Sequence, residues 1–164
     1  MRRIILLIIT CLFIAKLAFC AQMKITSPVF DNNGFIPAKY TCQGEDINPP
    51  LVIESLPQGT KTLVLIVDDP DAPVRTWVHW VVYNIEPVTQ IKENSVPGTE
   101  VMNDSGKIAY HGPCPPSGIH RYFFKIYALD SSIERSINSA KDLEKAMQGH
   151  ILASSELIGL YKKH

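Results

Sequence analysis

One uninterrupted apolar run, residues 63–67 (LVLIV), constrains the fold of this chain most. The run is rich in β-branched residues and is bounded by a turn at residues 57–60 (PQGT) and by residues 68–70 (DDP). Its length and composition favour a strand that is buried on both faces. The run therefore predicts a strand of a sheet that other elements cover on both sides.

Two longer segments have the composition of further strands. Residues 77–84 (WVHWVVYN) and residues 121–129 (RYFFKIYAL) are rich in aromatic and β-branched residues. Because side chains alternate along a strand, we expect Val78 and Trp80 to share the face opposite His79. In the second segment, alternation predicts one apolar face made of Tyr122, Phe124, Ile126 and Ala128.

The rest of the chain is rich in turn residues. It contains 12 prolines and 9 glycines, which indicates many turns and few long helices. Residues 139–148 (SAKDLEKAMQ) do predict a helix, which Asn138 or Ser139 can cap and Gly149 can end. We therefore expect a single β-rich domain over residues 21–164, with two packed sheets and little helix.

The first 20 residues predict a targeting segment. Two arginines precede an apolar run over residues 4–15, which Lys16 ends before it reaches the roughly 20 residues of a membrane-spanning helix. A cleaved secretory signal is therefore favoured, and the mature protein is expected in the periplasm or secreted. Residues 17–20 (LAFC) also resemble a lipobox, so a form tethered to a membrane through a lipid on Cys20 stays open.

Charge and cysteine content narrow the possible functions. The chain has 16 basic and 16 acidic residues, and without the first 20 residues the balance is 13 to 16, or a formal charge of −3. This sign disfavours a nucleic-acid binder, which needs positive charge to displace counterions. Cys42 and Cys114 remain after the targeting segment, as one disulfide or as two buried thiols. No spacing of cysteine and histidine suggests a metal site.

Residues that could form a binding site are concentrated in two clusters. The first consists of residues 68–73 (DDPDAP) and, shortly after them, His79. The second is residues 110–122 (YHGPCPPSGIHRY), in which His120 and Tyr122 are two apart at the start of a strand and so share a face. If the clusters meet, two imidazoles and a phenol can donate hydrogen bonds to a phosphate or carboxylate group.

The other residues of these clusters have supporting roles in this interpretation. Asp69 and Asp71 would accept the far ring N–H of a pocket histidine, which fixes its tautomer. Gly112 has no side chain, so a ligand could approach its backbone closely. We expect His111 and His150 to be surface or packing residues.

The two clusters resemble the signature regions of the phosphatidylethanolamine-binding proteins. The resemblance also includes residues 40–44 (YTCQG) and residues 49–51 (PPL), and it covers residues 23–163. It is closest to the bacterial and archaeal branch, which is often labelled Raf-kinase-inhibitor-like. It implies a mainly β fold of two antiparallel sheets packed as a sandwich, with one or two short C-terminal helices. The anion pocket that it implies would use Asp69, Asp71, His79, His120 and Tyr122, with Gly112 and Pro113 at its rim.

The resemblance also implies a disulfide, and this sequence departs from the family pattern at three positions. The family places the loops of Cys42 and Cys114 close together, which implies a disulfide between them. Ile53 stands where the bacterial branch usually has tryptophan, and Asn48 where serine is common. Gln43 replaces a frequent acid. These departures are expected to alter the entry loop and to leave the pocket unchanged.

The resemblance implies non-catalytic binding of phosphate, phospholipid head groups or other small anions, without a cofactor or a bound metal. The alternative is a protein-interaction module that inhibits a kinase or protease and uses the pocket as a docking point. An enzyme is disfavoured, because Ser117 and Cys114 lie in the right loop but have no assigned base. The physiological ligand, the protein partner and the presence of a homodimer stay open.

Overall fold

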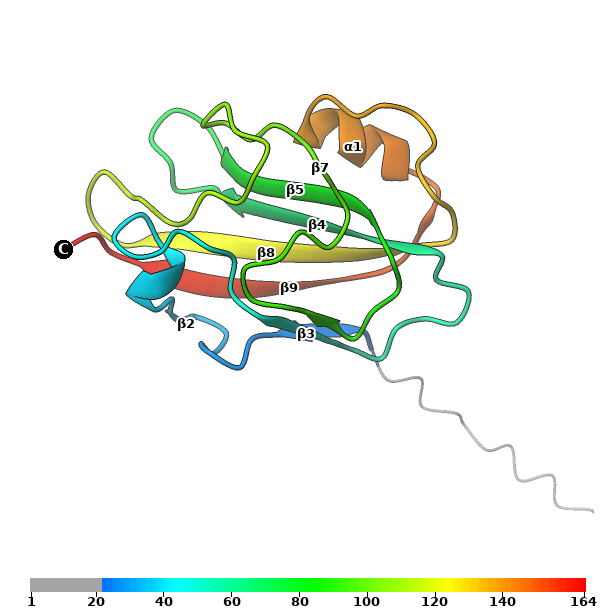
Figure 1. The fold of residues 1–164 in the computed structure, drawn as a ribbon, viewed down its shortest axis with the longest axis horizontal. Helices are drawn as coiled ribbons and strands as arrows, with labels where there is room; N and C mark the ends of the chain where they lie inside the picture. Colours follow the sequence, from blue (N-terminus) through cyan, green and yellow to red (C-terminus); the bar gives the residue numbers. More distant parts are fainter. Residues whose placement is uncertain (1–21) are drawn as a thin grey trace, which may run out of the picture.

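The computed structural model describes residues 22–164, so the predicted targeting segment and Cys20 lie outside the described residues. Short strands dominate this part of the chain, and the helical pieces are small (Figure 1). In chain order the elements are β1 (Lys24–Thr26), β2 (Gly34–Phe35), the 3-10 helix η1 (Ala38–Tyr40), β3 (Leu51–Glu54), β4 (Thr62–Asp69), β5 (Trp77–Ile85), β6 (Gln90–Ile91), β7 (Thr99–Glu100), β8 (His120–Leu129), α1 (Ala140–Met147) and β9 (Ile151–Tyr161).

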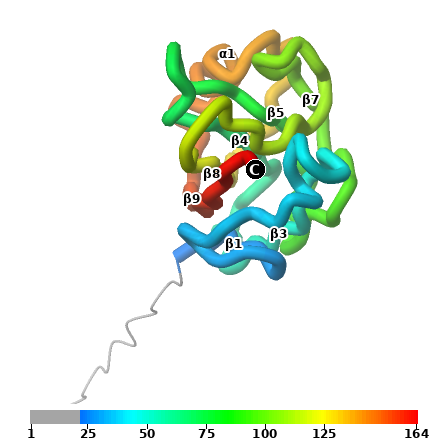
Figure 2. Tube along the Cα trace, turned by 90° about the vertical axis from the view of Figure 1, so that its left-hand side faces the viewer, coloured from blue at the N-terminus to red at the C-terminus, as the bar shows by residue number. Residues whose placement is uncertain are grey.

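The strands form two sheets, as predicted. A large sheet has the order β2-β9-β8-β4-β5-β7, and a small sheet has the order β1-β3-β6. Neighbouring strands are antiparallel except for β2, which pairs in parallel with β9 at the edge of the large sheet. The small sheet and α1 lie on opposite sides of the large sheet (Figures 1 and 2).

The central strand β4 is covered on both faces, which confirms the prediction from its sequence. Leu63, Leu65 and Val67 lie in the core between the two sheets. Val64 and Ile66 lie in a second core beneath α1. The predicted apolar face of β8 is confirmed in the first core and consists of Tyr122, Phe124, Ile126 and Ala128.

The predicted alternation of side chains along β5 is wrong at one point. Val67 of β4 pairs with Trp80, but Asp68 pairs with Val78, so His79 is an extra residue in β5. Trp80 therefore belongs to the core between the sheets, while Val78 packs on the core beneath α1. A β-bulge of this kind bends a strand and redirects a side chain, and here that side chain is His79.

The C-terminal helix has the predicted ends. The hydroxyl of Ser139 accepts a hydrogen bond from the backbone N–H of Asp142 at 3.1 Å, and Gly149 follows the helix with φ of 82°. Leu143 and Met147 are the buried residues of α1. Within residues 22–164, no helix is long and apolar enough to cross a bilayer.

Candidate ligand-binding pocket

Three neighbouring strands have their ends at one side of the large sheet, on the left in Figure 1. β4 ends at Asp69, which pairs with Trp77 at the start of β5, and β8 begins beside them at His120. A cavity of about 330 Å³ opens between these ends. It is lined by Asp69, Ala72, Pro73, Trp77, His79, His111, Cys114, Pro116, His120 and Tyr122.

Asp69 and His120 form a buried pair in this cavity. Nδ1 of His120 donates to Oδ2 of Asp69 at 2.7 Å, and Oδ1 of Asp69 accepts from the backbone N–H of Asp71 at 2.8 Å. Both carboxylate oxygens therefore have donors, which is what a buried carboxylate requires. Because Nδ1 carries the hydrogen bond, Nε2 is the ring nitrogen of His120 that stays available to a ligand.

The β-bulge positions His79 in the same cavity. Its Nδ1 donates to the backbone carbonyl of His111 at 2.7 Å, which again leaves Nε2. Burial lowers the pKa of His79 below its usual value of 6.5, so the ring is neutral at pH 7. An anion that enters the pocket would favour the protonated form of this ring over the neutral form.

Tyr122 contributes a hydroxyl to the pocket. Its ring meets the ring of His79 edge-on, with 5.2 Å between the centroids, and its side chain is fully buried. Burial, together with the charge of Asp69, raises the pKa of Tyr122 far above its usual value, so the hydroxyl keeps its proton. This hydroxyl donates no hydrogen bond to any of residues 22–164. A buried donor without an acceptor is costly, and a ligand oxygen would satisfy it.

Asp71 lies outside the lining and binds Arg121 instead of a histidine. Its carboxylate accepts from Nε and Nη2 of Arg121, at 2.9 and 2.7 Å, and from the backbone N–H of Arg121 at 2.9 Å. The hydrogen bonds from Arg121 lower the pKa of Asp71 to about 2. Asp71 thus holds the first residues of β8 against the loop after β4, and it positions His120 indirectly.

Gly112 and Pro113 also lie behind the lining. The backbone N–H of Gly112 donates to Oδ1 of Asp46 at 2.6 Å, and the carbonyl of Pro113 accepts from the backbone N–H of Cys42 at 3.2 Å. A Cβ atom at residue 112 would lie 2.5 Å from the carbonyl oxygen of Tyr40. The close backbone approach that we expected from a ligand is therefore made by the loop around residues 40–46.

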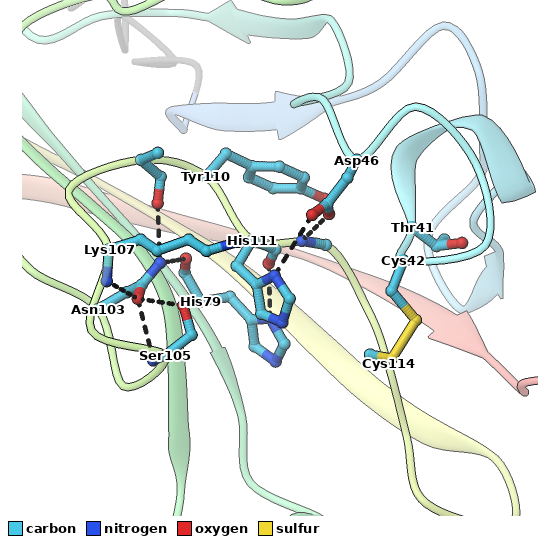
Figure 3. Close-up of polar contacts among 12 residues, drawn as sticks. Thr41, Cys42, Asp46, His79, Asn103, Ser105, Lys107, Tyr110, His111 and Cys114 are labelled. Carbon is cyan, nitrogen blue, oxygen red and sulfur yellow. Dashed lines mark hydrogen bonds and ion pairs between the residues drawn. A yellow bond between two sulfur atoms is a disulfide. The ribbon is translucent and has the colours of Figure 1, made fainter.

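The disulfide between Cys42 and Cys114 is present, as the resemblance implied. The two sulfur atoms are 2.12 Å apart, and the bridge joins residues 72 positions apart in the chain (Figure 3). Cys114 itself lines the cavity. The bridge therefore ties one wall of the pocket to the loop that follows η1.

His111 and Asn103 are the residues that sequence reasoning missed. The ring of His111 lines the pocket and stacks on His79, with 5.8 Å between the centroids and 11° between the planes. Asn103 is buried, and its amide donates to the carbonyls of His79 and Ala109, at 3.1 and 2.8 Å (Figure 3). The position of His111 directly before Gly112 was a usable signal, whereas nothing in the sequence marked Asn103.

Comparison with known proteins agrees with this geometry. The phosphatidylethanolamine-binding protein model matches residues 26–162. The chain belongs to this family. Archaeal and bacterial proteins are among its relatives, which confirms the predicted branch. The UPF0098 protein PH1269 of Pyrococcus horikoshii is 52% identical over 154 residues, which is 87% of this chain and 77% of the relative. The UPF0098 protein of Chlamydia trachomatis is 44% identical over 152 residues, 86% of this chain and 99% of the relative.

Two solved structures of phosphatidylethanolamine-binding protein relatives share the fold. The Chlamydia trachomatis homologue CT736 has a TM-score of 0.84 and 43% identity, over 87% of this chain and 99% of that one. YbcL of Escherichia coli, described as a member of the mammalian family, has a TM-score of 0.80 and 27% identity, over 88% and 100% of the two chains. Membership of the family supports a binding role for this protein at the level of the family.

Proposed function

We propose that the pocket binds a small phosphorylated or other anionic group, such as a phospholipid head group, without transforming it. The observation that carries this proposal is the convergence of His79, His120 and the unpaired hydroxyl of Tyr122 on one cavity. Each can donate a hydrogen bond to an anionic oxygen when the imidazoles are protonated. The carboxylate of Asp69 is already bound on both oxygens, so it supports His120 and leaves the ligand to the donors.

The walls of the pocket strengthen these contacts. Ala72, Pro73, Trp77 and Pro116 are apolar or carry few polar atoms, and they reduce the water around the donors. Charge-assisted hydrogen bonds are stronger in such surroundings than in water. An anion next to His79 would also offset the burial that lowers the pKa of this ring, so binding and proton uptake would favour each other.

The proposal includes no catalytic step. The sulfur of Cys114 is bonded to Cys42 and so is not a free nucleophile. Ser117 lies outside the lining of the cavity. In residues 22–164, no group of three or more histidine, cysteine, aspartate or glutamate side chains is arranged to hold a metal ion.

An exported location is part of the same proposal. Its support is the signal-like sequence of the first 20 residues, together with a disulfide that suits an oxidising compartment. Mass spectrometry of the mature protein tests it. Cleavage before Ala21 is expected for a periplasmic or secreted form, and a lipid on Cys20 for an anchored form. An intact Met1 would contradict export by either route.

Titration calorimetry with phosphorylethanolamine tests the ligand class. We expect binding that is tighter near pH 6 than near pH 8, because protonated imidazoles hold an anion better than neutral ones. His120→Phe should weaken binding at both values, since it removes a donor and keeps a ring. Negligible heat at both pH values would remove the proposal.

The alternative, an interaction module for a kinase or protease, has one structural feature in its favour. Val74 and Ile119, in the two loops that flank the pocket, are 94% and 53% exposed. Apolar side chains exposed at the mouth of a pocket could be covered by a partner protein. Capture of a partner protein that is lost in a Val74→Asp/Ile119→Asp variant, while phosphorylethanolamine binding is retained, would favour this alternative.

A further inference from the structure

His111 is part of a second pair of an imidazole and a carboxylate at the pocket. Oδ2 of Asp46 lies 3.4 Å from Nδ1 of His111, and Oδ1 of Asp46 is held by the backbone N–H of Gly112 (Figure 3). Nδ1 of His111 is buried and has no hydrogen-bond partner of good geometry in residues 22–164. The carboxylate is therefore fixed beside a ring nitrogen that would gain from carrying a proton.

The two stacked rings differ in what their Nδ1 atoms face. His79 faces a neutral carbonyl, that of His111, whereas His111 faces the carboxylate of Asp46. A charge on one ring disfavours a charge on the other, because the rings lie 5.8 Å apart. His111 therefore has a counter-charge at hand that His79 lacks. The titratable groups around these rings are Asp46, Asp69, Asp104, Tyr110, His120 and Tyr122.

We propose that His111, charged through Asp46, determines the ligand specificity of the pocket by selecting doubly charged anions over singly charged ones. The inference rests on the proposed function and deepens it. With His120 on Asp69 and His111 on Asp46, two cationic rings each have Nε2–H left for the ligand. Both carboxylates lie on the Nδ1 side of their rings, so the ligand meets the charged Nε2–H donors first, and a dianion gains more attraction from these donors than a monoanion does.

Calorimetry with sulfate and acetate near pH 6 tests the proposal, because sulfate keeps two charges and acetate has one. His111→Phe keeps a ring to stack on His79 and removes the charge. We expect it to weaken sulfate binding about ten- to hundredfold, and acetate binding about threefold or less. His150→Phe is the matched control, since His150 pairs with Asp130 at 2.8 Å and lines a different cavity. It should leave both affinities unchanged.

A second variant and a spectroscopic measurement test the proposal even if the His111→Phe variant does not fold. Asp46→Asn retains an oxygen that accepts from Gly112, yet removes the charge that faces His111. It should weaken sulfate binding more than acetate binding. In the wild-type protein, NMR of the histidine ring carbons should show His111 taking up a proton when sulfate is added.

Three results would overturn the inference. One is sulfate binding by His111→Phe at wild-type affinity, and another is an equal loss for sulfate and acetate. The third is a His111 ring that stays neutral in the sulfate complex near pH 6. All three leave the proposed function in place if His120→Phe still weakens anion binding. Wild-type protein that binds neither sulfate nor phosphorylethanolamine would overturn the proposed function and the inference together.

Discussion

The same pair of side chains occurs at the two ends of the large sheet in very different surroundings. His120 donates to Asp69 at 2.7 Å, and His150 contacts Asp130 at 2.8 Å. The side chains of the first pair are 9% and 5% exposed, and those of the second are 49% and 47% exposed. The bond lengths are almost equal, so the difference lies in burial.

Burial decides what such a pair can contribute. Water solvates both partners at the exposed end, so the pair adds little there and either side chain can turn away. At the pocket end, each partner depends on the other for its hydrogen bond, and the ring of His120 is held in one orientation. The strand ends that enclose His120 and Asp69 therefore hold this pair in one arrangement, which the exposed pair lacks.

The largest expected effect comes from removing each carboxylate in turn. Asp69→Ala leaves the ring of His120 and the backbone N–H of Asp71 without an acceptor, and should lower the free energy of unfolding by about 3–5 kcal/mol. Asp130→Ala should lower it by less than about 1 kcal/mol. Urea unfolding near pH 7 measures both. Equal losses would break the comparison, because they would mean that burial adds nothing to the first pair.

The disulfide adds a second difference between the two ends of the large sheet, because it stabilises only the end that carries the pocket. Replacing Cys42 and Cys114 together with alanine should lower the free energy of unfolding by about 2–4 kcal/mol. Amide hydrogen exchange should rise mainly in residues 40–46 and residues 111–114, with little change in α1. Exchange that rises as strongly in α1 as beside the pocket would contradict a local effect of the bridge.

The smallest expected effect is a pH dependence at His79. Burial lowers the pKa of His79 in the folded protein below 6.5, so the unfolded chain binds the proton more readily. This contribution to stability is complete above pH 6.5 and is lost as the pH falls from 6.5 through the folded pKa, by less than about 1.4 kcal/mol per pH unit. His79→Asn should reduce the slope of the unfolding free energy in this window, and His150→Asn should not. Identical slopes for the two variants would refute the assignment.

The sequence was sufficient to predict the layered arrangement of the fold. Residues 63–67 could be assigned to a doubly covered strand because few other structures accommodate so short and apolar a run. Ser139 and Gly149 marked the ends of α1 because capping is a local property. The bulge at His79 could not be predicted, since it depends on how β5 pairs with Asp68 and Val67 of the neighbouring strand.

The candidate site was likewise predictable only for residues that local sequence pattern or the family resemblance places. Asp69, His120 and Tyr122 are placed by strand ends, which pattern and resemblance locate. His111 depends on Asp46, 65 positions earlier in the chain, and on a ring that only the bulge brings beside it. Contacts between distant loops leave no periodic signal, so their partners become visible only when the chain is folded.

The wall that carries His111 has a kinetic consequence. It is fastened by the Cys42–Cys114 bridge and by the hydrogen bond from Gly112 to Asp46, and its sequence is stiffened by prolines. A site built in advance loses little conformational entropy when it is filled. Ligands that differ in affinity should therefore arrive at similar rates and differ chiefly in residence time, as is common for preformed sites.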